Sequence, residues 1–339
     1  MPLPISQLVP VLDLSQPVEA LAKVFKTACE DHGFFFIRNT GISPKLVAEH
    51  ANAQRRFFEL PEEQKRTILA DENNRGYTPL HEQTLDPSRS TQGDSKEGLY
   101  FGREIPSTSA EAVLPLHGPN QWPDETLLPG YREIVEEYIA AMYKLCMQML
   151  PILSIALELP SQDYLDQYFR SPMIFLRPLR YPEGFISNEE EGRHAAGAHS
   201  DYGCLTILWT DGTPGLQIFY KGEWVDVEVP ESVVEGGGGD VFVVNLGDML
   251  ERWTAGKFAS TVHRVVSKEG KERYSCPFFF EPSPDSLIAP LPGCRENTKG
   301  SGRDSGKYAP ITALEYLLGR YKATHEGYNG KMKSKEAKI

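Results

Sequence analysis

Two histidines and an aspartate in the second half of the chain have the types and spacing of a metal-binding site. His199 and Asp201 are two residues apart, and His263 follows far along the chain. Residues i and i+2 of a β-strand point to the same face, so the first two side chains would project side by side. The second histidine completes the cluster only if the sheet folds back. Two histidines and one carboxylate leave open positions on an octahedral metal, an arrangement typical of non-haem Fe(II).

A second i, i+2 pair lies ten residues after His263, in an apolar stretch typical of a strand. Arg273 and Ser275 would face the same side of this strand. A guanidinium fork and a hydroxyl suit one carboxylate, which accepts two parallel charge-assisted hydrogen bonds from Arg and a third from Ser. A metal site followed by such a pair indicates an acidic co-substrate that also chelates the metal.

Other interpretations of these residues are weaker. His194 has the type of a ligand, but the set of two histidines and one carboxylate is complete without it. Asp248 is better explained as the cap of a short helix over 249–253. A zinc hydrolase would use the same triad but has no need of the Arg/Ser pair. A jelly-roll binding protein without catalysis is the non-enzyme alternative, and O2-dependent succinate formation distinguishes it from an enzyme.

With these motifs the chain resembles the Fe(II)/2-oxoglutarate-dependent oxygenases of the isopenicillin N synthase-like group, including thymine-hydroxylase-like and plant or algal small-molecule enzymes. The resemblance extends over nearly the whole chain, from the VPVLDL segment at 9–14 to the last helix. Its most specific part is the H-x-D…H…R-x-S series. Fe(II), 2-oxoglutarate and O2 are the cofactor and co-substrates that it implies.

The resemblance assigns a role to each motif residue. The implied iron ligands are His199, Asp201 and His263. The implied partners of the distal carboxylate of 2-oxoglutarate are Arg273, Ser275 and Tyr181. Many relatives have Asn two residues before this Tyr, where the present chain has Leu179. A polar contact to the co-substrate is therefore absent or supplied from elsewhere.

The implied reaction converts 2-oxoglutarate and O2 to succinate and CO2 and abstracts hydrogen from a C–H bond of a small-molecule metabolite. Hydroxylation, desaturation and oxidative ring closure all begin in this way, so the motifs do not distinguish them. Hydrogen abstraction requires no side chain as general acid or base, and we expect no catalytic group beyond the iron centre. An Fe(II) oxidase of the same family that binds a carboxylate of its own substrate with the R-x-S pair is the alternative.

Strand alternation extends the expected site toward the substrate. If Arg273 faces inward, so do Phe279 and Glu281, and if Tyr181 faces inward, so does Arg177. These three positions, Arg177, Phe279 and Glu281, also match substrate-contacting positions in the family that the chain resembles. Phe101, on a short strand expected at 99–101, is a candidate for the opposite wall.

An arginine that points into an apolar cavity is costly unless an anion meets it. Either the substrate supplies a carboxylate to Arg177, or Glu281 forms an internal ion pair with it. We favour an acidic, amino-acid-derived substrate of specialised metabolism, with an amine or hydroxyl that contacts Glu281.

The elements that must position these residues change in type along the chain. Short segments separated by Gly, Pro and Asp predict strands at 173–181, 204–210, 215–219, 223–228, 240–245, 262–267 and 273–281, with 197–201 leading into the first ligands. So many short strands in series are typical of a jelly roll, in which two packed sheets hold the site at one open end.

Helical periodicity dominates the first half. The expected helices are 18–32, 44–58 and a short one after Leu60, with strands at 8–14 and 34–37, and mostly loop over 70–125. The longest helix is expected from 131 to about 159, kinked or broken at Pro151, and a terminal helix at about 312–325.

The predicted fold class is therefore α+β, with a double-stranded β-helix (jelly roll) core, flanking helices and an N-terminal helical and β region packed on it. We divide one compact unit into the N-terminal region 1–125, the supporting helix 126–172, the jelly-roll core 173–290 and the C-terminal loop, helix and tail 291–339.

Composition limits the partners. The net charge of −12 argues against nucleic acid, because phosphate binding needs a basic face. Five scattered cysteines without a C-x-x-C motif indicate reduced thiols in a cytoplasmic protein. No apolar run approaches the ~18 residues of a membrane span, and the N-terminus lacks a secretory signal. We expect a cytoplasmic monomer that binds a small molecule and neither nucleic acid nor a membrane.

Overall fold

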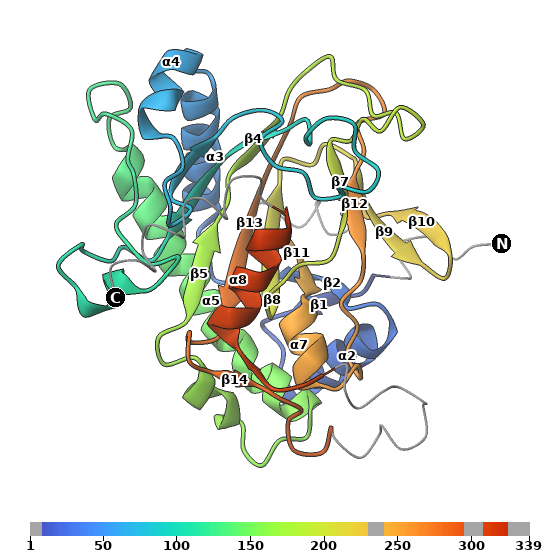
Figure 1. Cartoon of the computed structure of the whole chain (residues 1–339). Coiled ribbons are helices and arrows are strands. Elements are labelled where there is room, and N and C mark those ends of the chain that lie inside the picture. The colour runs from blue at the N-terminus through green and yellow to red at the C-terminus, as the bar shows by residue number, and fades with distance from the viewer. Residues whose placement is uncertain (1–8, 230–240, 295–307, 325–339) are drawn as a thin grey trace.

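The chain folds into two β-sheets surrounded by helices (Figure 1). The computed structural model describes residues 9–229, 241–294 and 308–324. The larger sheet contains β1 (Val11–Asp13), β2 (Phe34–Arg38), β3 (Gly76–Thr78), β4 (Glu97–Gly102), β5 (Met173–Leu176), β6 (Leu179–Tyr181), β8 (Leu205–Thr210), β11 (Phe242–Leu246) and β13 (Arg273–Glu281). The smaller sheet contains β7 (Ala196–His199), β9 (Leu216–Tyr220), β10 (Glu223–Asp226) and β12 (His263–Val265). A separate hairpin pairs β14 (Leu287–Ile288) with β15 (Ile311–Thr312).

The helices are α2 (Val18–Asp31), α3 (Pro44–Phe58), α4 (Glu62–Lys65), α5 (Tyr131–Ala156), α7 (Asp248–Trp253) and α8 (Ala313–Thr324). Short 3-10 turns lie at η1 (Arg66–Ile68), η2 (Ala110–Val113) and η3 (Tyr164–Tyr168). The larger sheet has the order β1-β2-β11-β8-β13-β5-β4-β3, and β6 pairs with both β13 and β4. The smaller sheet has the order β10-β9-β12-β7. This arrangement confirms the predicted jelly-roll core with helices packed on it.

Strand β13 separates the interior of the roll from the helical layer. Its residues alternate strictly, as a period of two requires. The side chains that face the interior cavity are Arg273, Ser275, Pro277, Phe279 and Glu281. The side chains that face the hydrophobic core on the other side are Tyr274, Cys276, Phe278 and Phe280. One strand therefore supplies both the floor of the cavity and the surface against which the helices pack.

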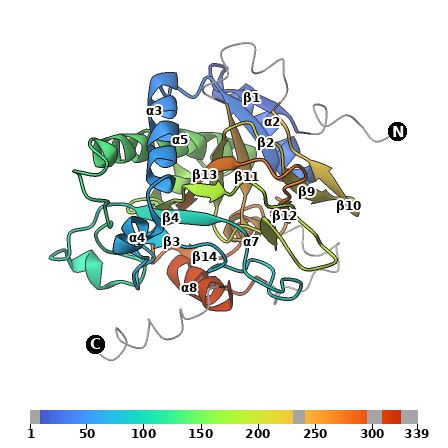
Figure 2. The same cartoon turned by 90° about the horizontal axis from the view of Figure 1, so that it is seen from above.

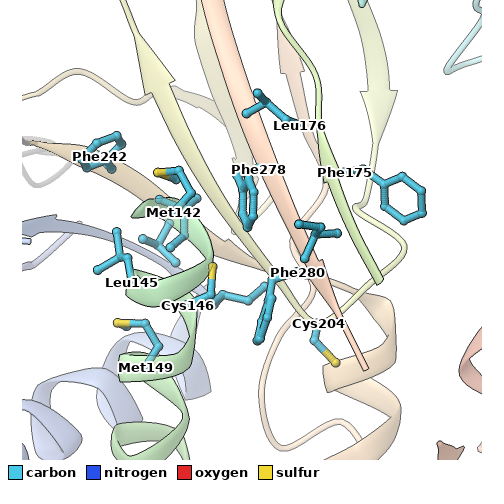
Figure 3. Packing of buried hydrophobic residues seen from close by; sticks show 14 of the residues in the cluster. Met142, Leu145, Cys146, Met149, Phe175, Leu176, Cys204, Phe242, Phe278 and Phe280 are labelled. Carbon is cyan, nitrogen blue, oxygen red and sulfur yellow. The ribbon is translucent and has the colours of Figure 1, made fainter. Parts of the chain in front are cut away.

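Helix α5 covers the core face of this strand. Figure 3 shows Met142, Cys146 and Met149 of α5 on the side of the sheet to which Phe278 and Phe280 point. Helices α2 and α3 pack against α5 in turn. Of the two predicted effects of Pro151, a kink or a break, the break does not occur, because α5 continues across this proline to Ala156. Burial of the residues on either side of Pro151 stabilises the helix beyond it and offsets the lost backbone hydrogen bond.

The length and composition of α5 alone would allow it to cross a membrane, and it is the one such helix in the described ranges. Half of its apolar window is buried inside the protein. Its contacts with α2, α3 and β13 are those of a core helix.

The segment predicted as one strand over 173–181 forms two, β5 and β6, which are separated at Arg177 and Pro178. Pro178 has no N–H to donate, and β13 pairs with each half in a continuous register. The region 70–125, expected to be mostly loop, contains the short strand β3, which pairs with β4. Most of the expected C-terminal loop and the tail, at 295–307 and 325–339, lie outside the described residues.

Helix α8 confirms the predicted terminal helix and lies on the opposite side of the large sheet from α5 (Figure 2). Helix α7 is also confirmed, but Asp248 is not its cap. Gly247 occupies the cap position, and Asp248 lies in the first turn. Its carboxylate accepts hydrogen bonds from Ser260 Oγ at 2.8 Å and Tyr316 OH at 3.1 Å. Asp248 therefore links α7 to α8.

The assignment of Phe101 to a substrate wall is wrong. Phe101 is fully buried in the core, where its ring stacks on Trp122 with centroids 4.8 Å apart. Alternation along β4 places Tyr100, one residue earlier, on the cavity side. The expected strand at 99–101 is therefore present, and the error lies in which of its faces is buried in the core.

Because Phe101 is a core residue, Phe101→Ala should lower the free energy of unfolding by about 3–5 kcal/mol. Urea denaturation of the variant and the wild type measures this difference. The iron and 2-oxoglutarate affinities of the folded variant should stay close to those of the wild type. An unchanged unfolding midpoint would contradict the core assignment.

Candidate active site

Three side chains converge at the interior end of the small sheet. His263 of β12 pairs directly with His199 of β7 across the two strands. Asp201 lies two residues beyond His199, past the end of β7. Its Oδ1 is 3.9 Å from Nε2 of His199 and 3.7 Å from Nε2 of His263. The ligand atoms of all three lie within 4.8 Å of one another, a separation that fits a single metal ion.

Backbone carbonyls fix both imidazole rings. Nδ1 of His199 donates to the carbonyl of Gly197 at 2.8 Å, and Nδ1 of His263 donates to the carbonyl of Thr261 at 3.0 Å. The lone pair of each Nε2 is therefore left for a metal. Burial, followed by the nearby His263, lowers the pKa of His199 to about 4. His199 is therefore a neutral imidazole at neutral pH, the form that binds metals.

The carboxylate of Asp201 is held by two neighbouring strands. Its Oδ2 accepts hydrogen bonds from Thr206 Oγ1 on β8 at 2.5 Å and from Asn245 Nδ2 on β11 at 2.6 Å. Burial acts to raise its pKa, but the two histidines and these two hydrogen bonds together lower it. Oδ1 is thus left toward the histidines, in a group that stays ionised. The donor set fits Fe(II).

Arg273 and Ser275 enter the same cavity from β13. Nε of Arg273 donates to the carbonyl of Thr213 at 3.2 Å, which fixes the guanidinium plane. Its Nη1 is buried and has no hydrogen-bond partner among the described residues. An unpaired buried guanidinium nitrogen is costly, so the position fits a ligand carboxylate. The residues present therefore fit 2-oxoglutarate.

Tyr181 completes this end of the cavity. It pairs with Arg273 between β6 and β13, and the guanidinium carbon lies 5.1 Å from the centroid of its ring. Burial raises the pKa of Tyr181, while Arg273 and a hydrogen bond with Ser275 act to lower it. Leu179, where the family resemblance led us to expect Asn, packs in an apolar cluster with Ala196 and Val265. The polar contact is therefore absent at that position.

The cavity extends from this end past the metal ligands to α8. The empty space in the cavity and its open mouth together is about 980 Å³. Three residues predicted to contact substrate line it: Arg177, Phe279 and Glu281. Lining residues that the sequence reasoning missed are Lys96, Tyr100, Tyr202, Leu317 and Tyr321. Alternation along β4 could have identified Lys96 and Tyr100, whereas no sequence signal indicates that α8 covers this cavity.

Arg177 has no acidic partner among the described residues. Its guanidinium nitrogens donate to Thr78 Oγ1 at 3.2 Å and Gln83 Oε1 at 3.1 Å, both neutral groups. Its guanidinium carbon lies 3.6 Å from the centroid of the Tyr100 ring. The side chain is almost fully buried. The structure therefore shows no ion pair between Arg177 and Glu281.

Glu281 is instead hydrogen-bonded to the backbone. Its Oε2 accepts from the N–H of Cys204 at 2.7 Å. Burial raises its pKa to about 8, and the nearby Asp201 also acts to raise it. Glu281 is therefore largely protonated at neutral pH. Gly203 makes this packing possible, because a Cβ at that position would lie 1.6 Å from Oε2 of Glu281.

His194 is absent from the metal cluster, as expected. It lines a separate cavity on the outer side of β7, together with Arg264 and Glu189. Arg264 forms an ion pair with Glu189 there.

Comparisons with known proteins match this geometry. The family model described as "non-haem dioxygenase in morphine synthesis N-terminal" matches residues 9–125, and that of the 2OG-Fe(II) oxygenase superfamily matches residues 172–282. A 2-oxoglutarate-Fe(II) type oxidoreductase of Emericella nidulans, hxnY, is 35% identical over 314 residues, which are 90% of this chain and 85% of the relative. The 2-oxoglutarate-dependent dioxygenase caaD of Aspergillus niger is 36% identical over 77% of this chain and 78% of its own length.

Solved structures show the same fold. A full-length Neurospora crassa protein in complex with alpha-KG and thymine has a TM-score of 0.77 and 27% identity, and the match covers 93% of this chain and 96% of that one. The structure of JOX2 with 2OG, Fe and JA has a TM-score of 0.71 and 26% identity, and the match covers 91% of this chain and 84% of that one.

The chain belongs to the 2OG-Fe(II) oxygenase superfamily. It is an Fe(II)- and 2-oxoglutarate-dependent dioxygenase that oxidises small molecules.

Replacing Asp201 by Ala should abolish Fe(II) binding and turnover together, because the two histidines alone lose the anionic ligand. Metal content after dialysis and succinate formation from 2-oxoglutarate measure the two losses. Asp226→Ala on the outer strand β10, where Asp226 pairs with the exposed Lys268, is the matched control. Wild-type iron occupancy in the Asp201 variant would exclude this ligand assignment.

Proposed function

We propose that this dioxygenase oxidises an anionic small molecule whose carboxylate binds Arg177. The observation that supports this function is the buried Arg177 guanidinium, which faces the cavity and contacts only neutral groups. A buried cation without an acidic partner is costly, and an anionic substrate would remove that cost. In this proposal His199, Asp201 and His263 hold iron, and Arg273, Ser275 and Tyr181 bind the distal carboxylate of 2-oxoglutarate.

When bound, Fe(II), 2-oxoglutarate and O2 supply the oxidant that removes hydrogen from a substrate C–H bond. The side chains of this chain position the reactants. Arg273 fixes 2-oxoglutarate on one side of the iron ligands, and Arg177 fixes the substrate carboxylate on another. Phe279 and Tyr100 supply apolar surface that keeps water from the target bond. Protonated Glu281 donates a hydrogen bond to a hydroxyl of the substrate, or accepts one from a substrate ammonium group at its carbonyl oxygen.

Relatives of similar fold support a small substrate of this size. The Neurospora crassa structures contain thymine or 5-formyluracil beside alpha-KG, and the JOX2 structure contains JA beside 2OG and Fe. For this chain we propose a substrate of similar size, an acidic, amino-acid-derived metabolite of specialised metabolism.

We further propose a monomer that works in the cytoplasm, apart from membranes and nucleic acid. The five cysteines are all free and buried, which suits a reducing compartment. The net charge of −12 suits neither nucleic acid nor an anionic lipid surface. Light scattering after gel filtration, and fractionation of cells that express the protein, test these two points.

The alternative within the family is an Fe(II) oxidase that binds its own substrate with Arg273 and Ser275. Omission of 2-oxoglutarate separates the two. The proposed dioxygenase forms no product without it and releases succinate with it, in an O2-dependent reaction. Product formation that proceeds equally well without 2-oxoglutarate would support the oxidase.

Arg273→Gln should weaken 2-oxoglutarate binding by roughly 2–5 kcal/mol, because a bidentate charged partner of a buried carboxylate is lost. Ser275→Ala should cost less, about 0.5–1.5 kcal/mol, because a single hydroxyl hydrogen bond is removed. Calorimetric titration with 2-oxoglutarate measures both values. Equal, small losses would show that another residue holds the carboxylate.

Arg177→Met should prevent binding of the true substrate while 2-oxoglutarate binding stays intact. Substrate is identified by incubating the Fe(II) enzyme and 2-oxoglutarate with fractionated metabolites and measuring substrate-dependent succinate. On the identified substrate the variant should lose about 2 kcal/mol or more of binding free energy. Slow, uncoupled succinate formation should persist. Arg132→Met on the exposed side of α5 is the control, and normal turnover by the Arg177 variant would exclude an acidic substrate held there.

A further inference from the structure

Lys96 faces the same cavity as Arg177 and has no role in the site described so far. It immediately precedes β4 and shares the cavity side of that strand with Gly98 and Tyr100, as alternation requires. Only 5% of the residue is exposed. Lysine is among the residues least often buried, and it is buried almost only when paired.

The partner of Lys96 is Asp94, whose Oδ2 accepts from Nζ at 2.6 Å. An ammonium group carries three N–H donors. Among the described residues Asp94 Oδ2 is the one side-chain acceptor that the Lys96 ammonium reaches. Two donors of a buried ammonium are therefore available at the cavity wall.

Two cations lie close together at this wall. A Cβ at Gly98 would lie 2.7 Å from Cδ2 of Leu179 and 3.1 Å from Nη1 of Arg177, so the missing side chain lets the Arg177 guanidinium lie close against β4. Burial lowers the pKa of Lys96, Asp94 acts to raise it, and the charge of Arg177 lowers it further. The two positive charges therefore repel each other inside the protein.

A single carboxylate is available to the two cations, and it pairs with Lys96 alone. Asp94 is fully buried and is paired with Lys96. Glu281, the other acidic side chain of the cavity besides Asp201, is largely protonated and is bonded to the backbone of Cys204. The charges of Lys96, Asp94 and Arg177 sum to +1, and N–H donors of the Lys96 ammonium remain unused beside this charge. A ligand with a single negative charge would neutralise it and accept those hydrogen bonds.

We propose that Lys96 is a second substrate-binding residue, and that Lys96 and Arg177 together bind one carboxylate group of a monoanionic substrate between them. The inference rests on the proposed function, because it places this carboxylate in the cavity of the dioxygenase. It predicts that the substrate carries a single carboxylate, since a second one would meet no further cation on this wall.

Asp94 gives this site a fixed distance from the metal ligands. Its Oδ1 accepts from the N–H of Gly197 at 3.0 Å, and the carbonyl of Gly197 accepts from Nδ1 of His199 at 2.8 Å. Lys96 is thus attached, through Asp94 and the backbone of Gly197, to the strand that carries His199. A carboxylate bound at Lys96 therefore has a defined position relative to the iron ligands, as the attack on one particular C–H bond requires.

The test measures binding of simple carboxylates by calorimetry, with Ni(II) in place of Fe(II) and saturating 2-oxoglutarate, so that Arg273 is occupied and no turnover occurs. The probes are benzoate and hexanoate, each compared with its uncharged amide. Wild type should bind each acid at least about tenfold more tightly than its amide, because hydrogen bonds to charged groups are the stronger ones. Lys96→Met should lose most of this preference. Lys45→Met, on an exposed position of α3, is the matched control and should keep it.

Asp94→Asn distinguishes a binding role from a structural one. Asn keeps an oxygen for the N–H of Gly197 but no longer competes for the ammonium, so the acids should bind this variant at least as tightly as wild type. A merely structural ion pair would make Lys96→Met and Asp94→Asn equally harmful. The double variant Asp94→Asn/Lys96→Met, which leaves no unpaired carboxylate, should lose the preference as Lys96→Met does.

The inference is overturned if wild type binds the acids no better than the amides, or if Lys96→Met keeps the preference. It is also overturned if Asp94→Asn weakens acid binding as strongly as Lys96→Met does. The proposed function fails separately, if the Fe(II) enzyme forms no succinate from 2-oxoglutarate while the acid preference and its dependence on Lys96 are observed.

Discussion

The strict alternation of β13 is the constraint on which the rest of the structure depends. One face of the strand carries Arg273, Ser275, Phe279 and Glu281 into the cavity, and the other packs Phe278 and Phe280 on α5. A shift of one residue would exchange the two faces and bury the arginine against the helix. Pairing with β5, β6 and β8 prevents this shift, because each neighbour contributes to the same two faces.

The parts of the fold that could be predicted from sequence are those with local periodicity. The bounds of β13 and α3 were predicted to the residue, and those of α2 within one residue, because their apolar patterns are long. The H-x-D and R-x-S pairs identified the side chains that the structure brings together. Phe101 was misplaced because a strand of six buried residues has no polar face from which to infer orientation. The contribution of α8 depends on packing between distant segments, which no local pattern records.

The surroundings of each carboxyl group in the cavity determine whether it is ionised. Asp201 lies beside His199 and His263 and accepts two hydrogen bonds on its Oδ2 atom. Glu281 lacks such donors apart from one backbone N–H, and burial keeps it protonated. The same chemical group thus serves as a metal ligand in one position and as a neutral donor in the other.

Two glycines determine where these groups can lie. Gly203 leaves room for the Glu281 carboxyl group beside the metal-binding loop, and Gly98 leaves room for the side chains of Leu179 and Arg177 beside β4. A side chain at either position would displace a polar group of the cavity without altering the iron ligands. The metal centre therefore depends on which side chains are present as ligands. The shape of the substrate end of the cavity depends equally on the two positions occupied by glycine. For this reason the H-x-D and R-x-S motifs indicate the reaction class, and we propose that the residues on β4 and its neighbours determine which molecule is oxidised.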